Sequence, residues 1–167
     1  RNLTAHLLEK GRTLPGFIGD ISYAQSIRER YEGFCQALAD AGKKVDSSLC
    51  LTTPLGIDTY REEIDTFLSS LSRMPDAFVC ASDYVACILM QLLEKRGLRV
   101  PEDVAVSGFD NNTEDLLAEH LTTVQVFNEE LGARLALQIL YRIKYPNTPH
   151  EITYLGTNVL YRDSTGD

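Results

Sequence analysis

Six polar side chains follow three short apolar runs of the sequence, each where the run gives way to a loop. They comprise a guanidinium, two carboxylates, two hydroxyls and an amide: Arg28, Asp83, Asp110, Ser22, Ser82 and Asn111. The same loops also contain Asp20, Tyr23, Gln25 and Asn112. Hydrogen bonds to charged groups contribute ~1.5 to 3 kcal/mol each. Such a set suits a polyhydroxylated or heterocyclic small molecule, so the sequence predicts a ligand-binding cleft.

The residues needed for other kinds of chemistry are missing from these loops. The three histidines are His6, His120 and His150, and none of them lies there, so no catalytic base is available for a serine or cysteine nucleophile. The sequence contains no GxGxxG loop, no GxxxxGK[ST] loop and no HExxH motif or Cys/His cluster. We therefore expect a protein that is not an enzyme and holds no cofactor or metal.

Each candidate also has a purely structural interpretation. Arg28 stands in the first turn of a predicted helix, where an arginine is often a solvated charge. Asp83 follows a serine at a helix start, where a carboxylate complements the helix dipole. Asp110 precedes two asparagines, a pattern that is also typical of an ordinary Asx turn. The residue types alone leave these alternatives open.

The segments that position these side chains alternate between strands and helices. Short apolar runs predict strands over 16–19, 48–52, 77–80 and 103–109, and residues with helical spacing follow the first three. Strands that alternate with helices indicate an α/β fold with a parallel sheet flanked by helices, because parallel neighbours need a crossover connection. Ligands bind beyond the carboxyl ends of such strands, where the candidate loops would meet.

The pattern changes after Phe109. A strand is predicted over 122–126, a long helix over 128–145, and two short strands over 151–155 and 158–162, joined at Gly156. Apolar residues surround the long helix on most sides, as expected for an element that packs against neighbours outside these 167 residues.

Composition limits the function further. The 167 residues are 44% hydrophobic and have a net charge of −8, which predicts a folded chain that does not bind nucleic acid by itself. The longest uncharged apolar stretch, 84–93, is about half of the ~20 residues that span a membrane. Four cysteines without a CxxC pair indicate free thiols in a reducing cytoplasm. The chain starts at Arg1, and we expect it to be part of a longer protein.

Several segments resemble the LacI/GalR family of bacterial transcriptional repressors. The segment GLRVPEDVAVSGFDN at 97–111 is similar to the hallmark of that family, and LTTV at 121–124 follows it at the expected distance. Further similar segments lie at 28–34, 78–86 and 160–165, so the resemblance covers nearly the whole chain.

The resemblance implies the C-terminal subdomain of an effector-binding module with the type I periplasmic-binding-protein fold, a fragment of a two-subdomain module. Residues 1–124 would form this subdomain, 125–150 a crossing strand and a helix that belong to the other subdomain, and 151–167 the return strands. Arg28 would grip the effector, Ser82 would stand where an asparagine usually contacts it, and Asp110 would take its hydroxyl or amine groups.

The function implied is that of a cytoplasmic, homodimeric regulator. Its effector-sensing domain would bind a small molecule, with a sugar favoured over a purine, and would control operator DNA binding by a separate helix-turn-helix domain. Neither a membrane nor a cofactor is implied. The alternatives are a periplasmic solute-binding protein of a sugar transporter and, with least support, an α/β enzyme of the flavodoxin or Rossmann kind.

Overall fold

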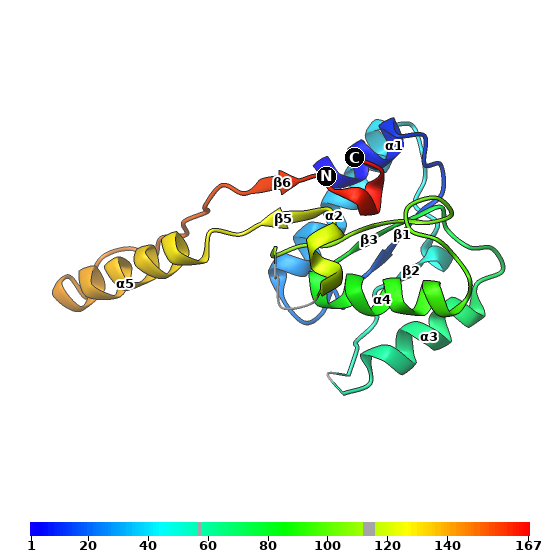
Figure 1. Cartoon of the computed structure of the whole chain (residues 1–167). Coiled ribbons are helices and arrows are strands. Elements are labelled where there is room, and N and C mark those ends of the chain that lie inside the picture. The colour runs from blue at the N-terminus through cyan, green and yellow to red at the C-terminus, as the bar shows by residue number, and fades with distance from the viewer. Residues whose placement is uncertain (57, 112–115) are drawn as a thin grey trace.

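A four-stranded parallel sheet forms the centre of the molecule (Figure 1). The computed structural model describes residues 1–56, 58–111 and 116–167. Within them, the strands of this sheet lie in the order β2-β1-β3-β4. Their bounds are β1 (Pro15–Ile18), β2 (Cys50–Leu51), β3 (Ala77–Cys80) and β4 (Ala105–Ser107). All neighbouring pairs are parallel, as the alternation of strands and helices predicts.

Helices cover both faces of the sheet. On one face, α1 (Asn2–Glu9) and α2 (Gln25–Asp40) enclose a core that contains Phe17 and Phe34. On the other, α3 (Tyr60–Ser70) and α4 (Asp83–Lys95) pack against a core that contains Phe78 and Leu89. All four of these core side chains are at most 1% exposed. This two-sided burial confirms the α/β prediction and explains the continuous apolar runs of the strands.

The helix ends follow local rules of the sequence. The hydroxyl of Ser82 accepts a hydrogen bond from the backbone N–H of Val85 at 3.3 Å, which caps the N-terminus of α4. The same helix ends just before Gly97, whose φ of +72° is a left-handed conformation that glycine adopts without strain. The direction of α4, with its N-terminus at the carboxyl edge of the sheet, is therefore set locally.

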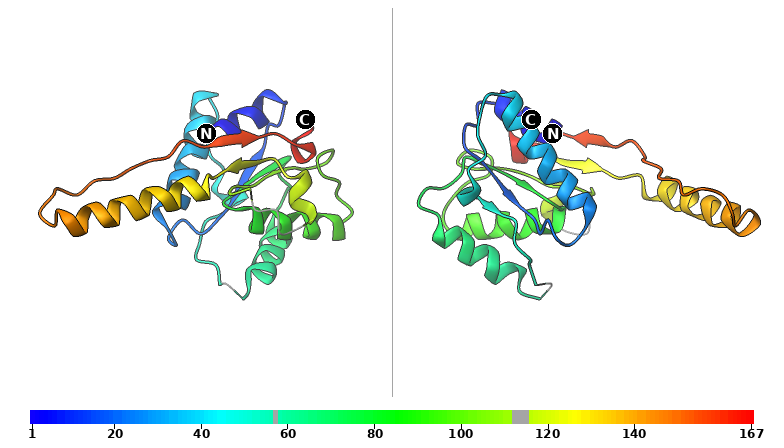
Figure 2. Two further views of the ribbon diagram at one scale, coloured as in Figure 1. Left: turned by 60° about the vertical axis from the view of Figure 1, so that its left-hand side comes forward. Right: turned by 180° about the vertical axis from the view of Figure 1, so that it is seen from behind.

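A long arm projects from this body (Figures 1 and 2). The arm starts with β5 (Thr123–Gln125), continues through α5 (Asn128–Lys144) and returns through β6 (Asn158–Leu160). β5 and β6 pair in antiparallel register. α5 contains no buried residue, and these apolar side chains are 48 to 73% exposed: Leu131, Leu135, Leu137, Ile139, Leu140, Tyr141 and Ile143.

One predicted strand does not form. Residues 151–155 have no regular secondary structure, and Ile152 and Tyr154 are 80% and 74% exposed. The apolar pattern is present, but no strand of the described chain lies beside this segment to accept its backbone hydrogen bonds. The second strand of the predicted pair does form as β6, because β5 lies beside it.

The end of the chain returns to the body. Ser164 donates a 2.6 Å hydrogen bond from Oγ to the carbonyl of Val106 in β4, and the same oxygen accepts the N–H of Thr122 at 2.8 Å. Ser164 is only 2% exposed. This buried link fastens the chain after β6 to the start of the arm and to the last strand of the sheet.

Candidate functional site

Arg30 is the central cation at the carboxyl edge of the sheet. It extends from α2 and donates a hydrogen bond to the carbonyl of Ala81, just beyond β3. Its guanidinium lies 3.5 Å from the ring centroid of Phe109, and it approaches the carboxylate of Asp110 to 3.6 Å. The side chain of Arg30 is 22% exposed. A partly desolvated guanidinium beside a carboxylate is suited to hydrogen bonding with hydroxyl or anionic groups of a ligand.

Asp110 lies opposite Arg30 on a strained backbone. Its φ is +109°, a region that L-residues rarely adopt, and its N–H donates to the carbonyl of Val124 at 2.9 Å. Burial raises the pKa of Asp110, the nearby charge of Asp83 raises it further, and Arg30 opposes both effects. The carboxylate is 44% exposed, so it remains open to a ligand.

Asp83 forms the inner wall of the site. It is 2% exposed, and its carboxylate accepts a 2.6 Å hydrogen bond from the hydroxyl of Thr123. Its backbone N–H donates to the carbonyl of Phe109 at 2.8 Å. A Cβ at Gly108 would collide with this carboxylate, so a side chain at that position would displace Asp83. Asp83 therefore joins α4 to the loop after β4 and to β5, which is a positioning role.

The two remaining candidates near this edge have local partners. Ser82 uses an oxygen lone pair to cap α4, which leaves its O–H free to donate. Asn111, with a φ of +54°, accepts a 2.9 Å hydrogen bond from the guanidinium of Arg162. The side chain of Asn111 is thus committed to the segment after β6. Asn112 lies outside the described residues.

Arg28 and Ser22 lie apart from this group. Both are exposed, and both line a shallow hollow of about 390 Å³ beside the start of α2. The hydroxyl of Ser22 donates to the buried carboxylate of Asp20 at 2.6 Å. Arg28 and Arg30 are two positions apart, and a helix turns by ~100° per residue. Their side chains therefore point in directions ~200° apart, to nearly opposite sides of α2. The structure thus places Arg30, and not Arg28, beside Asp110.

A signal for Arg30 was present in the sequence. Arg30 precedes Phe34 by four residues and Ala37 by seven, so it lies on the same stripe of α2 as these two buried residues. An arginine on the buried stripe of a helix is directed toward the sheet. The helical spacing therefore distinguishes it from Arg28, which the residue type alone does not.

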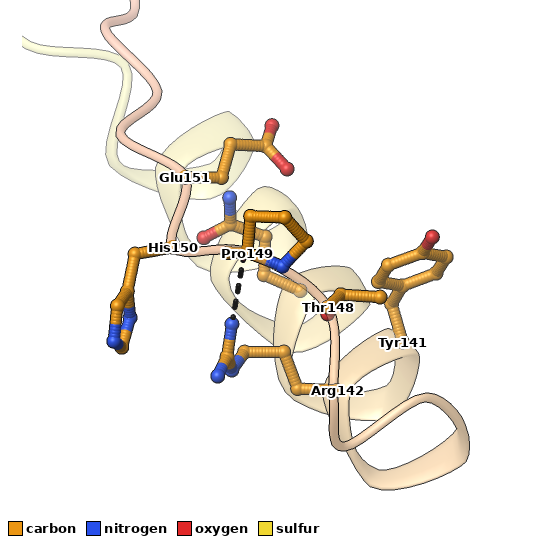
Figure 3. A pocket seen from close by; sticks show the side chains of 7 residues that line it. Tyr141, Arg142, Thr148, Pro149, His150 and Glu151 are labelled. Atoms are coloured by element: carbon orange, nitrogen blue, oxygen red, sulfur yellow. Dashed lines mark hydrogen bonds between the residues drawn. The ribbon is translucent and has the colours of Figure 1, made fainter.

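Two other hollows lie near the site or on the arm. One of about 280 Å³ is lined by Arg30, Phe109 and Cys80 together with the start of α1 and parts of the arm. The second, of about 380 Å³, lies on the arm between α5 and the returning chain (Figure 3). There Arg142 donates to the carbonyl of Pro149 at 3.3 Å. Arg30 lines the first of these hollows, whereas neither Arg30 nor Asp110 lines the second.

Metal-ion sites and membrane-spanning helices were sought over residues 1–56, 58–111 and 116–167. No group of three or more His, Cys, Asp or Glu side chains in this part of the chain is arranged to hold a metal ion. Nor is any helix there both long and apolar enough to cross a bilayer.

Comparison with known proteins places the fold in a family. Residues 4–165 match the family of periplasmic binding protein-like domains. The chain is 28% identical over 98% of its length to the HTH-type transcriptional repressor PurR of Photobacterium profundum, and covers 49% of that protein. It is 32% identical over 98% of its length to the HTH-type transcriptional regulator CelR of Thermobifida fusca, covering 48% of that protein. The chain thus spans about half the length of these relatives.

Two solved structures of transcriptional regulators have a fold similar to that of this chain. The structure of a transcriptional regulator CelR–cellobiose complex superposes with a TM-score of 0.86 at 30% identity, over 96% of this chain and 49% of that one. A LacI-family transcriptional regulator from Sanguibacter keddieii superposes with a TM-score of 0.85 at 27% identity, over 99% and 63% of the two chains.

The parallel sheet, with Arg30 and Asp110 at its carboxyl edge, therefore agrees with a periplasmic-binding-protein-like fold. The chain belongs to the family of periplasmic binding protein-like domains, and the relatives and solved structures that it matches include LacI-family and other HTH-type transcriptional regulators.

Proposed function

We propose that this chain senses a small-molecule effector, a sugar, at the carboxyl edge of its sheet and so controls DNA binding by a helix-turn-helix domain of the whole protein. The role is regulatory and not catalytic, and the protein acts as a homodimer in the cytoplasm. The observation that carries the proposal is the pair formed by Arg30 and Asp110, 3.6 Å apart and both accessible at the edge. A cation and a carboxylate side by side can bind neighbouring hydroxyl groups of one ring.

Each residue has a separate part in this proposal. Arg30 donates to the effector, Asp110 accepts from its hydroxyl groups, and the free O–H of Ser82 offers a further donor. Asp83 holds the loop after β4 in place and does not touch the effector. The cellobiose complex of CelR supports a sugar as the ligand class, because that regulator shares the fold at 30% identity.

The exposed arm is an argument that the whole protein has a second lobe beside this one. We propose that residues 125–150 pack within a second lobe and that 151–167 lead back to the first. α5 has no buried residue in this chain, although most of its circumference is apolar. Burying a leucine or isoleucine side chain contributes ~1.5 to 3 kcal/mol, so covering this helix would strongly favour the assembled module. The effector would then bind between the lobes.

The experiment compares two arginines of one helix in the full-length protein. We expect sugars screened by thermal shift to include at least one that raises the melting temperature of the wild type, because a ligand that binds only the native state stabilises it. Arg30→Ala should weaken that sugar roughly 30- to 150-fold by calorimetry, as expected for loss of ~2 to 3 kcal/mol of charge-assisted hydrogen bonding.

Arg28→Ala is the matched control, since it removes the same side chain from an exposed position of the same helix. It should leave the affinity unchanged. If Arg28→Ala abolishes binding while Arg30→Ala does not, the site has been placed on the wrong side of α2. A stabilising purine, with no stabilising sugar, would overturn the ligand class.

A further inference from the structure

Three tyrosines lie along the carboxyl edge of the sheet, beyond β1, β2 and β3. Tyr23 follows β1, Tyr60 begins α3 beyond β2, and Tyr84 lies in the first turn of α4 beyond β3. Tyr23 and Tyr84 are 71% and 59% exposed. Large aromatic side chains that are this exposed, and close together, are unusual unless they serve recognition.

One ring contact and one electrostatic interaction connect Tyr60 with the other two tyrosines. The rings of Tyr60 and Tyr84 meet edge to face, with centroids 5.8 Å apart and an interplanar angle of 84°. Burial raises the pKa of Tyr60, and smaller contributions come from Asp20, Tyr23 and Tyr84, so Tyr23 also lies within electrostatic range of Tyr60.

Asp20 fixes the backbone beneath them. Its carboxylate is 6% exposed and accepts hydrogen bonds from the backbone N–H groups of Tyr23, at 3.2 Å, and Leu55, at 3.3 Å. The loop after β1 is thereby fastened to the segment that precedes α3. A positioned aromatic surface loses little conformational entropy when a ligand stacks on it.

The strand order sets the distance along the carboxyl edge that a ligand would have to span. Asp110 follows β4, whereas the tyrosines follow β3, β1 and β2 in the order β2-β1-β3-β4. Neighbouring strands lie ~4.8 Å apart, so the edge from β4 to β2 spans ~14 Å. One sugar ring is shorter than this span. Tyr84 follows β3, one strand spacing from β4, whereas Tyr23 and Tyr60 follow β1 and β2, ~10 and ~14 Å from β4. A ligand that contacts Asp110 and reaches Tyr23 or Tyr60 therefore needs a second ring.

We propose that Tyr23, Tyr60 and Tyr84 form a stacking subsite for the second ring of a disaccharide whose first ring binds Arg30 and Asp110. This inference rests on the proposed function, because it assumes that the first ring is bound at that pair. The C–H face of a sugar ring packs against an aromatic face, and the exposed rings of Tyr23 and Tyr84 supply such faces. The subsite selects for ligand length.

Calorimetry on the full-length protein tests this with matched pairs of sugars: glucose with cellobiose, glucose with maltose, and galactose with lactose. The wild type should bind the disaccharide of one pair more tightly than the monosaccharide. Tyr84→Ala and Tyr23→Ala should each weaken that disaccharide about tenfold, with less than a twofold effect on the monosaccharide. Tyr84→Phe should bind as the wild type does, because it keeps the ring.

Tyr161→Ala is the control for removing a tyrosine elsewhere; Tyr161 is 46% exposed, and its ring packs against that of His6 at a 40° tilt. It should leave both affinities unchanged. If Tyr84→Ala and Tyr23→Ala leave the preference for the disaccharide intact, or if the wild type prefers the monosaccharide, the stacking subsite is wrong and the sugar-sensing function stands. If no sugar of any pair binds, the disaccharide subsite is wrong, and the sugar-sensing function is wrong as well only if the thermal-shift screen also finds no stabilising sugar.

Discussion

At the scale of single residues, Asp110 carries a carboxylate at a position that is unfavourable for a charge. Asp110 combines a φ of +109° with partial burial and the nearby charge of Asp83. Each of these features costs folding free energy, and Arg30 offsets only part of the cost, since the pKa of Asp110 remains above its ordinary value. Such an arrangement is typical of a binding residue, which is selected for its ligand and not for stability.

Replacing Asp110 with asparagine should therefore separate stability from binding. A carboxyl whose pKa is raised on folding destabilises the native state when it is ionised, and this penalty disappears as the pH falls and the group becomes protonated. We expect Asp110→Asn to raise the free energy of unfolding at pH 7 by less than ~1 kcal/mol, because the group is partly solvated, and so to raise the melting temperature slightly, while effector affinity falls.

Thermal melts at several pH values check this. The gain should shrink as the pH falls through the raised pKa of Asp110 and should vanish below the ordinary Asp value near ~3.9. An Asp110→Asn protein that is less stable than the wild type at pH 7 would show that the Arg30 ion pair stabilises the fold more than burial opposes it.

At the scale of elements, the start of α4 serves both the fold and the site. Ser82 caps the helix, Asp83 fastens it to the neighbouring loop and strand, and Tyr84 faces outward on the same turn. Three consecutive residues thus have three different roles: the first caps the helix, the second forms a buried hydrogen bond, and the third exposes an aromatic ring. Because the helix start is fixed on both sides, Tyr84 is presented in a defined direction.

The cap can be tested by substitution. Ser82→Ala should destabilise this chain by about 1 kcal/mol, since it leaves the N–H of Val85 without its acceptor. Ser82→Asn should retain most of the stability, because an asparagine side chain also caps helices well. Chemical denaturation of the three proteins measures the difference. Equal stability of Ser82→Ala and the wild type would mean that water replaces the hydroxyl at no cost.

At the scale of the whole molecule, the body buries its apolar side chains and the arm does not. The sheet is covered on both faces, and its core side chains are buried, whereas α5 and the chain that returns from it expose their apolar side chains. Figure 2 shows the arm extended away from the body in two further views. Apolar surface on this scale is rarely left in water.

The 167-residue polypeptide by itself should therefore self-associate through α5. Burial of leucine and isoleucine side chains at ~1.5 to 3 kcal/mol each outweighs much of the entropy lost on association, so light scattering at micromolar concentration should detect dimers or larger species. Leu135→Glu should shift the polypeptide toward the monomer. Arg134→Glu adds negative charge to the same exposed helix without removing an apolar side chain, and should not. A monomeric wild type at these concentrations contradicts the expectation.

The sequence by itself determined the alternation of strands and helices, the cap at Ser82 and the glycine after α4, because each depends on residues close together in the chain. The meeting of three loops at one edge follows from this alternation, since the carboxyl ends of parallel strands share an edge. Tertiary structure decided the rest. Arg162 binds Asn111 across 51 positions, and the segment 151–155 lacks the neighbouring strand that its apolar pattern anticipates. Helical spacing indicates that Arg30, and not Arg28, lies on the buried stripe of α2, but only the packing of that stripe on the sheet brings Arg30 beside Asp110.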